Sequence, residues 1–280
     1  MKITISKFAG FCQGVEKAYQ TVVDYVGKYD EDIYILGDLC HNQEIVKKIK
    51  SLGIKKISSI NNIQKGTVII TAHGIEKKII FKAKNKKLNI IDTTCPKVNR
   101  LQQIVHKFYK QGKKIIIFGD KNHKEIKGVN SWCDYQAVII SKIKDLQNID
   151  FSKFKNALFV SQTTQNQKNF MEIADILLKK IKKLKIFNTI CQTTKDRQED
   201  IKNLAKKNDA IIVVGDKKSA NSTRLFQIAK QKNKNSFFIN NVKKLNLKKF
   251  SKFKTVGVSA GASAPQWLID KICDKLKLIS

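Results

Sequence analysis

The stretch KITISKFAGFCQGVEKAYQTVVDYV, residues 2–26, contains the pattern that decides the fold. Residues 2–6 form a short apolar–polar run that predicts a strand, and Gly10 and Gly14 flank Cys12 in the segment that follows. From residue 15 onward the apolar side chains recur at the spacing of one helix face, at Val15, Ala18, Tyr19, Val22, Val23 and Val26. The stretch therefore predicts a strand, a loop that contains a cysteine, and an amphipathic helix.

The same alternation of strand and helix continues along the chain. Short apolar runs predict strands at 2–6, 32–36, 67–71, 88–92, 114–118, 137–140, 157–160, 185–190, 210–214, 236–239 and 254–258. Helical spacing follows several of these runs, for example at 98–108 and 170–181. Alternation of this kind predicts an α/β fold, in which helices cover mostly parallel sheets.

Three cysteines, Cys12, Cys95 and Cys191, divide the chain into three similar lengths. The stretch IIIFGDKNHKEIKG at 115–128 also resembles IIVVGDKKSANSTR at 211–224, since each is an apolar run followed by Gly-Asp-Lys and a polar helix start. We therefore expect three similar α/β lobes, each contributing one cysteine. Their predicted boundaries are 12–95, 96–190 and 191–280, with the N-terminal strand in 1–11 completing the third lobe.

The chain has 280 residues and a formal net charge of +32, which suggests a nucleic-acid-binding protein. However, only three of its 55 basic residues are arginine, the residue that reads bases and phosphates bidentately. No aromatic-basic motif of the kind found in RNA-binding domains occurs either. We interpret the lysines as a solvated surface, and a basic face that attracts an acidic protein partner is the alternative.

The longest apolar runs, such as AIIVV at 210–214, are far shorter than the roughly 20 residues that span a bilayer. The N-terminal residues contain neither a continuous apolar segment nor an amphipathic leader. We therefore expect a cytoplasmic protein.

Polar side chains collect where the predicted strands end. Ligands of parallel α/β sheets bind at this place, beyond the carboxyl ends of the strands. Imidazoles, hydroxyls, an amide and helix N-termini together suit a phosphate or diphosphate group. The residues at these ends are His41, Asn42, His73, Cys95, His123, Glu125, Gln162, Thr163, Thr164, Cys191, Ser219, Asn221 and Ser263.

The six cysteines allow two interpretations. Cys40, Cys133 and Cys273 are expected to be small buried apolar residues. For the other three, Cys12, Cys95 and Cys191, packing and metal binding are equally good interpretations from the residues alone. Three thiolates on one iron–sulfur cubane would leave its fourth iron without a protein ligand. A phosphate-binding module with a structural metal is a further alternative.

Nine stretches, taken together and in this order, resemble the LytB-type 4-hydroxy-3-methylbut-2-enyl diphosphate reductase family. They extend from residue 10 to residue 265, which is nearly the whole chain. The stretches are GFCQGVEKA, CHNQEIV, TAHGI, DTTCPKV, HKEIKG, SQTT, CQTTKDRQ, GDKKSANSTRL and SAGASAP.

The resemblance implies a three-lobed fold around a central cavity that contains a [4Fe–4S] cluster, held by Cys12, Cys95 and Cys191. Glu125 would be the proton source and would work with Thr163 beside the substrate hydroxyl. The residues that would bind the substrate are His41, His73, His123, Thr163, Ser219, Ala220, Asn221 and Ser263.

The implied reaction removes the hydroxyl group of an allylic diphosphate by reduction and gives isopentenyl and dimethylallyl diphosphate, the last step of the non-mevalonate isoprenoid pathway. The implied electron donor is ferredoxin or flavodoxin, with no nucleic-acid or membrane partner, and we expect a monomer. Two positions depart from the family pattern. Lys124 replaces a common proline, and Ala220 replaces a frequent second serine.

Overall fold

The computed structural model describes residues 1–28 and 31–279. The strands of these residues form three four-stranded sheets, and every neighbouring pair of strands is parallel. Their strand orders are β1-β12-β10-β11 (sheet A), β3-β2-β4-β5 (sheet B) and β7-β6-β8-β9 (sheet C). The predicted α/β class with parallel sheets is therefore confirmed.

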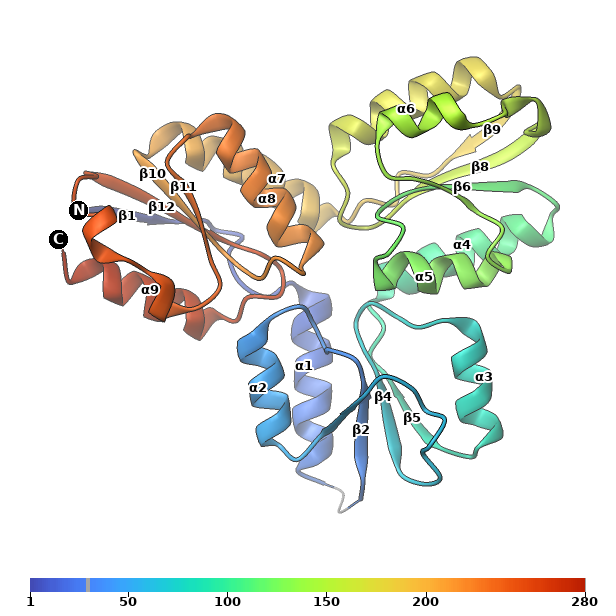
Figure 1. Ribbon diagram of the computed structural model, residues 1–280, viewed down its shortest axis with the longest axis horizontal. Helices are drawn as coiled ribbons and strands as arrows, with labels where there is room; N and C mark the ends of the chain where they lie inside the picture. Colours follow the sequence, from blue (N-terminus) through green and yellow to red (C-terminus); the bar gives the residue numbers. More distant parts are fainter. Residues whose placement is uncertain (29–30, 280) are drawn as a thin grey trace. The chain divides into compact units, whose positions relative to one another are not determined.

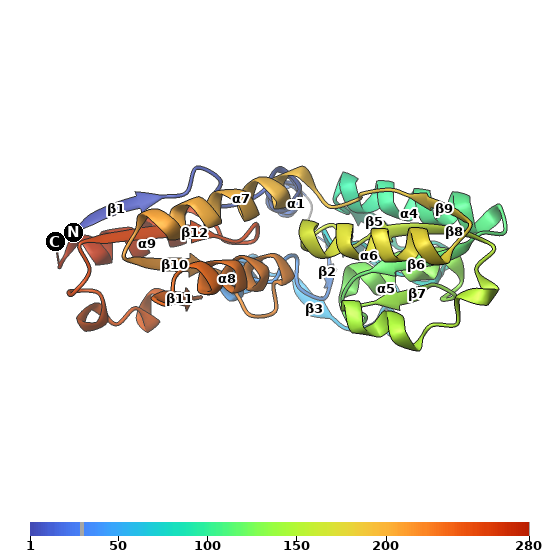
Figure 2. The ribbon, with the colours of Figure 1, turned by 90° about the horizontal axis from the view of Figure 1, so that it is seen from above.

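Sheet A is covered by helices on both faces (Figures 1 and 2). In its central strand β10, Ile211 and Val213 pack against α7 and α8, whereas Ile212 and Val214 pack against α9. Alternate residues of a strand point to opposite faces, so a continuous apolar run suits a strand that is buried on both. The elements are β1 (Lys2–Ile5), β10 (Ala210–Val214), β11 (Ser236–Ile239), β12 (Thr255–Ala260), α7 (Gln192–Lys207), α8 (Ala220–Lys232) and α9 (Gln266–Lys277).

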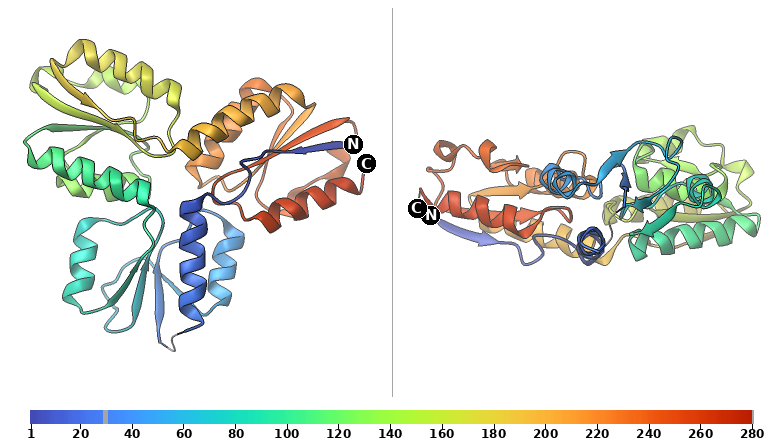
Figure 3. Two further views of the ribbon diagram at one scale, coloured as in Figure 1. Left: turned by 180° about the vertical axis from the view of Figure 1, so that it is seen from behind. Right: turned by 90° about the horizontal axis from the view of Figure 1, so that it is seen from below.

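Sheet C follows the same rule (Figures 1 and 3). In its strand β6, Ile115 and Ile117 pack against α4 and α5, and Ile116 and Phe118 pack against α6 on the other face. The elements are β6 (Lys114–Phe118), β7 (Val138–Ile140), β8 (Asn156–Ser161), β9 (Lys183–Ile186), α4 (Pro96–Lys110), α5 (Lys124–Asn130) and α6 (Gln167–Lys180).

Sheet B packs Val68 of β4 against Ala83 of α3 and against Leu88, which follows that helix. Its elements are β2 (Ile33–Leu36), β3 (Lys55–Ile57), β4 (Thr67–Ile70), β5 (Asn89–Asp92) and α3 (Lys77–Asn85). The remaining helices are α1 (Gln13–Val26), α2 (Gln43–Ser51) and the short 3-10 helices η1 (Ser131–Cys133), η2 (Ile143–Asn148), η3 (Phe151–Lys153), η4 (Val242–Lys244) and η5 (Leu247–Lys249).

The chain divides into two compact units. The first unit comprises residues 1–20, 38–53 and 192–280 and contains sheet A. The second unit comprises residues 21–37 and 54–191 and contains sheets B and C. The lobe boundaries expected at 12–95, 96–190 and 191–280 stay a prediction.

Two strands differ from the sequence-based expectation by more than two residues. Strand β3 was not predicted, because its sequence KKI has only one apolar residue and lies at the edge of sheet B. Strand β9 was predicted at 185–190 but spans Lys183–Ile186. The Phe187 N–H still donates to the Phe159 carbonyl oxygen at 2.9 Å. Further along, a side chain replaces the backbone partner, since the Thr189 hydroxyl donates to the Ser161 carbonyl oxygen at 2.5 Å and accepts from the Ser161 N–H at 2.8 Å. In the described part of the chain, no helix is long and apolar enough to cross a membrane.

Candidate functional site

The predicted site residues fall into two groups, one in each compact unit. All of them lie in the loops or first helical turns that follow strands. The first unit contains Cys12, His41, Ser219, Ala220, Asn221 and Ser263. The second unit contains His73, Cys95, His123, Glu125, Thr163 and Cys191.

In the first unit, three polar residues meet at the N-terminus of α8. Ser219 caps this helix, and its side-chain oxygen accepts a hydrogen bond from the Ser222 N–H at 3.3 Å. The Ser263 hydroxyl lies 3.1 Å from the His41 carbonyl oxygen and 3.4 Å from Ser219 Oγ. Residue 220 begins the helix, so Ala220 presents a methyl group where the resembled family often has a second hydroxyl.

Two glycines permit this close packing. A Cβ atom at Gly215 would stand 2.3 Å from Ser222 Oγ, and one at Gly261 would stand 1.9 Å from the same atom. Both distances are too short for real contacts, so only glycine lets the loops after β10 and β12 approach the first turn of α8. The glycines of the GDKKSANS and SAGASAP stretches therefore bring their serines together.

Asn221 is the most informative residue of this group. Its side chain is 4% exposed, and neither its amide nitrogen nor its amide oxygen has a hydrogen-bond partner among the described residues. A buried amide without partners costs free energy and is rare in folded proteins. The unpartnered amide therefore indicates a place where a polar ligand completes the site.

Cys12 lies half-buried in the loop between β1 and α1. Its N–H donates to the Ala262 carbonyl oxygen at 3.2 Å, which ties the loop to the SAGASAP stretch. The loop is held a second time by Arg197 of α7, a buried residue whose Nη2 donates to the Gly10 carbonyl oxygen at 2.8 Å. We did not predict a role for Arg197. The available signal was its place in the CQTTKDRQ stretch of a chain that is nearly devoid of arginine.

In the second unit, Glu125 and Thr163 form a buried pair. The Thr163 N–H donates to Glu125 Oε1 at 2.7 Å, and the Thr163 hydroxyl donates to Oε2 at 2.8 Å. Glu125 is 2% exposed, and this burial raises the pKa of its carboxyl group to about 7, although the two hydrogen bonds from Thr163 act in the opposite direction. The pair is thus a carboxylic acid that can hold or release a proton near neutral pH.

One histidine is hydrogen-bonded to the backbone of Glu125, and a second histidine lies against the first. His123 caps α5, and its Nδ1 accepts a hydrogen bond from the Glu125 N–H at 3.1 Å. The neutral ring therefore carries its proton on Nε2, where it can donate to a ligand. The ring centroid of His73 lies 5.3 Å from that of His123, in a T-shaped arrangement.

The other two predicted ligand cysteines have backbones that are tied to these residues. Cys95 caps α4, and its N–H donates to the carbonyl oxygen of Ala72, the neighbour of His73, at 3.0 Å. The Cys191 N–H donates to the Thr163 carbonyl oxygen at 2.9 Å. Within this unit, the structure therefore connects each cysteine to a residue predicted to bind substrate or to its neighbour.

The thiols divide into two classes. The expected burial of Cys40, Cys133 and Cys273 is confirmed, and burial raises the thiol pKa values to about 12, 11 and 11. Cys12, Cys95 and Cys191 are only half-buried and lie at loop or helix-cap positions. Among the described residues, no three His, Cys, Asp or Glu side chains form a group that could hold a metal ion. As a donor set, three accessible thiols still fit an iron–sulfur cluster, which takes cysteine thiolates as ligands.

The sequence model of the LytB protein family matches residues 3–277. A protein of Alkaliphilus oremlandii named 4-hydroxy-3-methylbut-2-enyl diphosphate reductase is 38% identical over 278 residues, which cover 99% of this chain and 99% of that protein. A protein of the same name from Clostridioides difficile is 38% identical over 273 residues, covering 97% of this chain and 98% of that protein. The structure of the E-1-hydroxy-2-methyl-but-2-enyl-4-diphosphate reductase from Plasmodium falciparum is similar with a TM-score of 0.93 and 28% identity, covering 99% of this chain and 88% of that one.

Proposed function

The chain belongs to the LytB protein family, and from this premise we propose that it catalyses the reductive dehydroxylation of (E)-4-hydroxy-3-methylbut-2-enyl diphosphate. In this reaction the allylic C–O bond breaks and the hydroxyl group leaves as water with one proton. Two electrons and a second proton complete the product, isopentenyl or dimethylallyl diphosphate. This is the last step of the non-mevalonate isoprenoid pathway.

The buried pair of Glu125 and Thr163 is the observation that carries the proposal. An allylic hydroxyl is a poor leaving group unless it is protonated, so the site needs an acid that is still protonated near pH 7. Glu125 meets this need, because burial raises the pKa of its carboxyl group to about 7. In this proposal the Thr163 hydroxyl, which lies 2.8 Å from Glu125 Oε2, passes the proton onward or binds the substrate oxygen.

We propose that the predicted substrate-binding residues bind the diphosphate group. In the first unit, the N-terminus of α8 supplies N–H groups, and Ser219, Asn221 and Ser263 supply side-chain partners. His41, Ala220, His73 and His123 complete the proposed set. Ala220 lacks the hydroxyl that would contact the diphosphate, and this loss should weaken the binding free energy by on the order of 1 kcal/mol.

The proposed cofactor is a [4Fe–4S] cluster held by Cys12, Cys95 and Cys191. When bound, it supplies the two electrons one at a time and an iron without a protein ligand for the substrate hydroxyl. Arg197 and the backbone of Ala262 hold the Cys12 loop for this task, and the Ala72 and Thr163 carbonyl oxygens fix the backbones of Cys95 and Cys191.

Ferredoxin or flavodoxin is the proposed electron donor, since the formal net charge of +32 favours an acidic protein. Steering by charge predicts that the reduction rate with this donor falls steeply as salt concentration rises, and a flat response would contradict it. Our proposal also includes a cytoplasmic, monomeric enzyme without nucleic-acid or membrane partners.

Iron and sulfide analysis after anaerobic reconstitution tests the cofactor assignment. We expect iron-loaded wild-type chain, and sharply reduced iron in Cys12→Ser, Cys95→Ser and Cys191→Ser. Cys273→Ser is the matched control and should keep its iron, because this thiol is buried between helix and sheet. A wild-type chain that stays colourless and free of iron would overturn the assignment.

A further inference from the structure

The first unit contains a cavity of about 530 Å³ that the proposed reaction does not use. It is lined on one side by residues of β1, including Thr4 and Ile5, and on the other side by residues of α7, including Leu204 and Lys207. Among the described residues, its lining contains none of the predicted site residues. We call this cavity the β1 groove.

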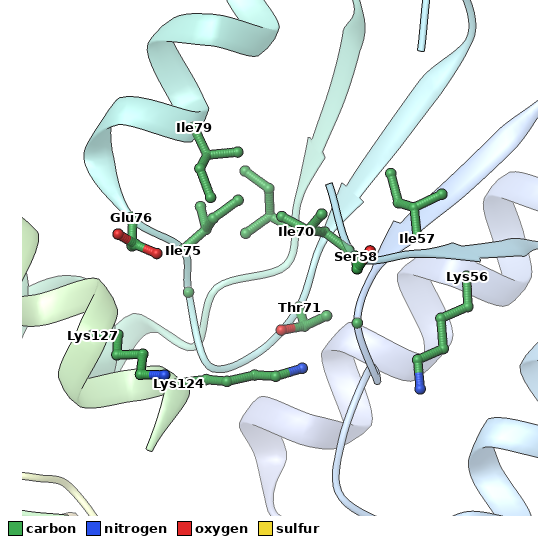
Figure 4. A pocket seen from close by; sticks show the side chains of 13 residues that line it. Lys56, Ile57, Ser58, Ile70, Thr71, Ile75, Glu76, Ile79, Lys124 and Lys127 are labelled. Atoms are coloured by element: carbon green, nitrogen blue, oxygen red, sulfur yellow. The ribbon is translucent and has the colours of Figure 1, made fainter. Parts of the chain in front are cut away.

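A carboxylate oxygen distinguishes the β1 groove from the cavity of about 560 Å³ at the carboxyl ends of sheet B. The lining of the latter includes Ile70, Ile75 and Ile79 (Figure 4), and none of the described polar atoms that are buried without a hydrogen-bond partner belongs to it. In the β1 groove, by contrast, Asp200 Oδ2 is buried and has no hydrogen-bond partner among the described residues. Such an oxygen costs free energy, so a ligand with a donor is favoured there.

The strand that lines the groove has an open edge. Among the described strands, β1 pairs with β12 alone and is the outer strand of sheet A (Figure 2). The N–H groups of Lys2 and Ser6 donate to backbone carbonyl oxygens of the neighbouring segment 254–258, each at 2.8 Å. Because successive residues of a strand turn their N–H and C=O groups to opposite edges, those of Ile3 and Ile5 face the open edge. An added strand could pair with them.

The two faces of β1 differ in character. Ile3 packs against the apolar cluster that contains residues of α9, and Ile5, two residues later on the same face, is 46% exposed. The opposite face carries Lys2, Thr4 and Ser6, which line the groove. An added strand would therefore meet an apolar side chain on one face and polar side chains on the other.

The charge of the groove selects the partner. Its lining contains Lys2, Lys7 and Lys207 but only one acid, Asp200. Among the described residues, none of these three lysines forms an ion pair, and Lys7 Nζ lies over the Phe8 ring at 5.0 Å from its centroid. The groove therefore favours an acidic partner. Lysines on an edge strand also prevent pairing with a like-charged strand, and the formal net charge of +32 disfavours a second copy of this chain.

We propose that the β1 groove binds an extended acidic segment of a partner protein, which pairs with β1 as a fifth strand of sheet A. In this mode of recognition the main-chain hydrogen bonds give affinity, and pockets for alternate side chains give specificity. The backbone of the segment pairs with Ile3 and Ile5, its acidic side chains lie among the lysines, and a hydroxyl or amide side chain donates to Asp200. This inference does not depend on the proposed reductase activity.

Amide hydrogen exchange of the full wild-type chain, measured by nuclear magnetic resonance, tests the pairing. The probe is a short acetylated and amidated peptide in which valine alternates with glutamate or threonine, as the two faces of β1 require. With saturating peptide, the Ile3 and Ile5 N–H groups should exchange about tenfold more slowly. The Phe238 N–H, on the open edge of β11 at the other side of sheet A, should not change. No protection of Ile3 and Ile5, or equal protection of Phe238, would overturn the proposal.

Two N-methylated versions of the peptide separate strand pairing from contact through side chains alone. One version is methylated at the valines and the other at the remaining residues, and only one of these two sets of N–H groups can face β1. One version should therefore lose binding while the other keeps most of it. Equal binding by both versions would overturn the added strand.

Calorimetry with two variants tests the chemistry of the groove. Lys7→Met/Lys207→Met should bind the peptide about tenfold more weakly, and Lys232→Met, an exposed lysine of α8 outside the groove, is the control. Unchanged affinity in the double variant would overturn the role of the lysines. Asp200→Ala should weaken binding of this peptide more than binding of a version with alanine at the threonines, and an equal loss would overturn the role of Asp200.

Sedimentation of the free chain separates a partner protein from a second copy. We expect no dimer at the concentrations used for calorimetry. A dimer that the peptide dissociates would assign the open edge of β1 to a second copy and overturn the acidic partner. None of these measurements follows reductase activity, so their failure and that of the proposed function are distinguishable.

Discussion

Thr163 holds both carboxyl oxygens of Glu125, one through its N–H at 2.7 Å and the other through its hydroxyl at 2.8 Å. The carboxyl group is enclosed in the second unit at 2% exposure. Burial favours the neutral acid, whereas both hydrogen bonds favour the carboxylate. The balance between these opposing effects sets the pH at which the acid is available.

Folding stability should report this balance directly. The pKa of Glu125 is raised from 4.5 to about 7 in the folded chain, so its contribution to stability is full below pH 4.5 and is lost as pH rises through about 7. Glu125→Gln mimics the neutral acid and does not titrate. Its free energy of unfolding should therefore exceed that of wild type by on the order of 3 kcal/mol above pH 7, and the difference should vanish at low pH.

Urea unfolding of the substrate-free chain at acidic and at alkaline pH measures this difference. Glu172→Gln is a suitable control, because that carboxylate lies on the exposed surface of α6. A difference between wild type and Glu125→Gln that does not change with pH would contradict a raised pKa.

The Thr163 hydroxyl should tune the pH profile of turnover. Since a protonated Glu125 is required, turnover should fall as pH rises through about 7. Thr163→Val removes the hydroxyl hydrogen bond that lowers this pKa and should shift the alkaline limb to higher pH, with slower turnover. Thr163→Ser keeps the hydroxyl and should leave the limb in place. The account fails if Val and Ser shift the limb equally.

Asn221 should show a trade-off between stability and binding. Its buried amide has no partner among the described residues, so Asn221→Leu should stabilise the substrate-free chain by about 1–3 kcal/mol and weaken substrate binding at least tenfold. Asn233→Leu is the matched control. The Asn233 amide donates to the Asn208 carbonyl oxygen at 2.7 Å, so this change should destabilise the chain. If Asn221→Leu and Asn233→Leu destabilise the chain to a similar extent, the Asn221 amide is not an unpaired group that awaits a ligand.

Arg197 should act as a positioning residue for Cys12. Its guanidinium holds the Gly10 carbonyl oxygen, two residues before the cysteine, at 2.8 Å. Arg197→Met should therefore lower the iron retained after reconstitution and broaden the electron paramagnetic resonance signal of the reduced chain. Arg197→Lys should recover part of both. Arg100→Met, on the exposed side of α4, should change neither. Full iron retention with an unchanged signal in Arg197→Met would refute this role.

Apolar periodicity predicted most of the fold because buried parallel strands are continuous apolar runs. Strand β10, with all five residues buried, is the clearest example. Strand β3 could not be found in this way, because its two lysines lie exposed at a sheet edge and its pairing depends on β2. The end of β9 was misplaced because the hydrogen bonds of Thr189 to the Ser161 backbone redirect the chain, and no local pattern signals such a contact.

The candidate site residues could be named from the sequence, but their partners could not. Glu125 and Thr163 lie 38 residues apart, and their hydrogen bonds follow from the adjacency of β6 and β8 in sheet C. The burial of the Asn221 amide without a hydrogen-bond partner depends on tertiary packing, and so does the hydrogen bond from Arg197 to the Gly10 carbonyl oxygen. Composition and spacing indicate which residue types are present, whereas burial and pairing decide their chemistry.

The most direct test of the central claim is product formation by anaerobically reconstituted chain supplied with (E)-4-hydroxy-3-methylbut-2-enyl diphosphate and a one-electron donor. We predict that wild type forms isopentenyl and dimethylallyl diphosphate, and that Glu125→Gln retains its iron but loses most turnover. Iron-loaded wild type that binds the substrate and forms neither product would contradict the proposed function, and full turnover in Glu125→Gln would contradict the role of the acid.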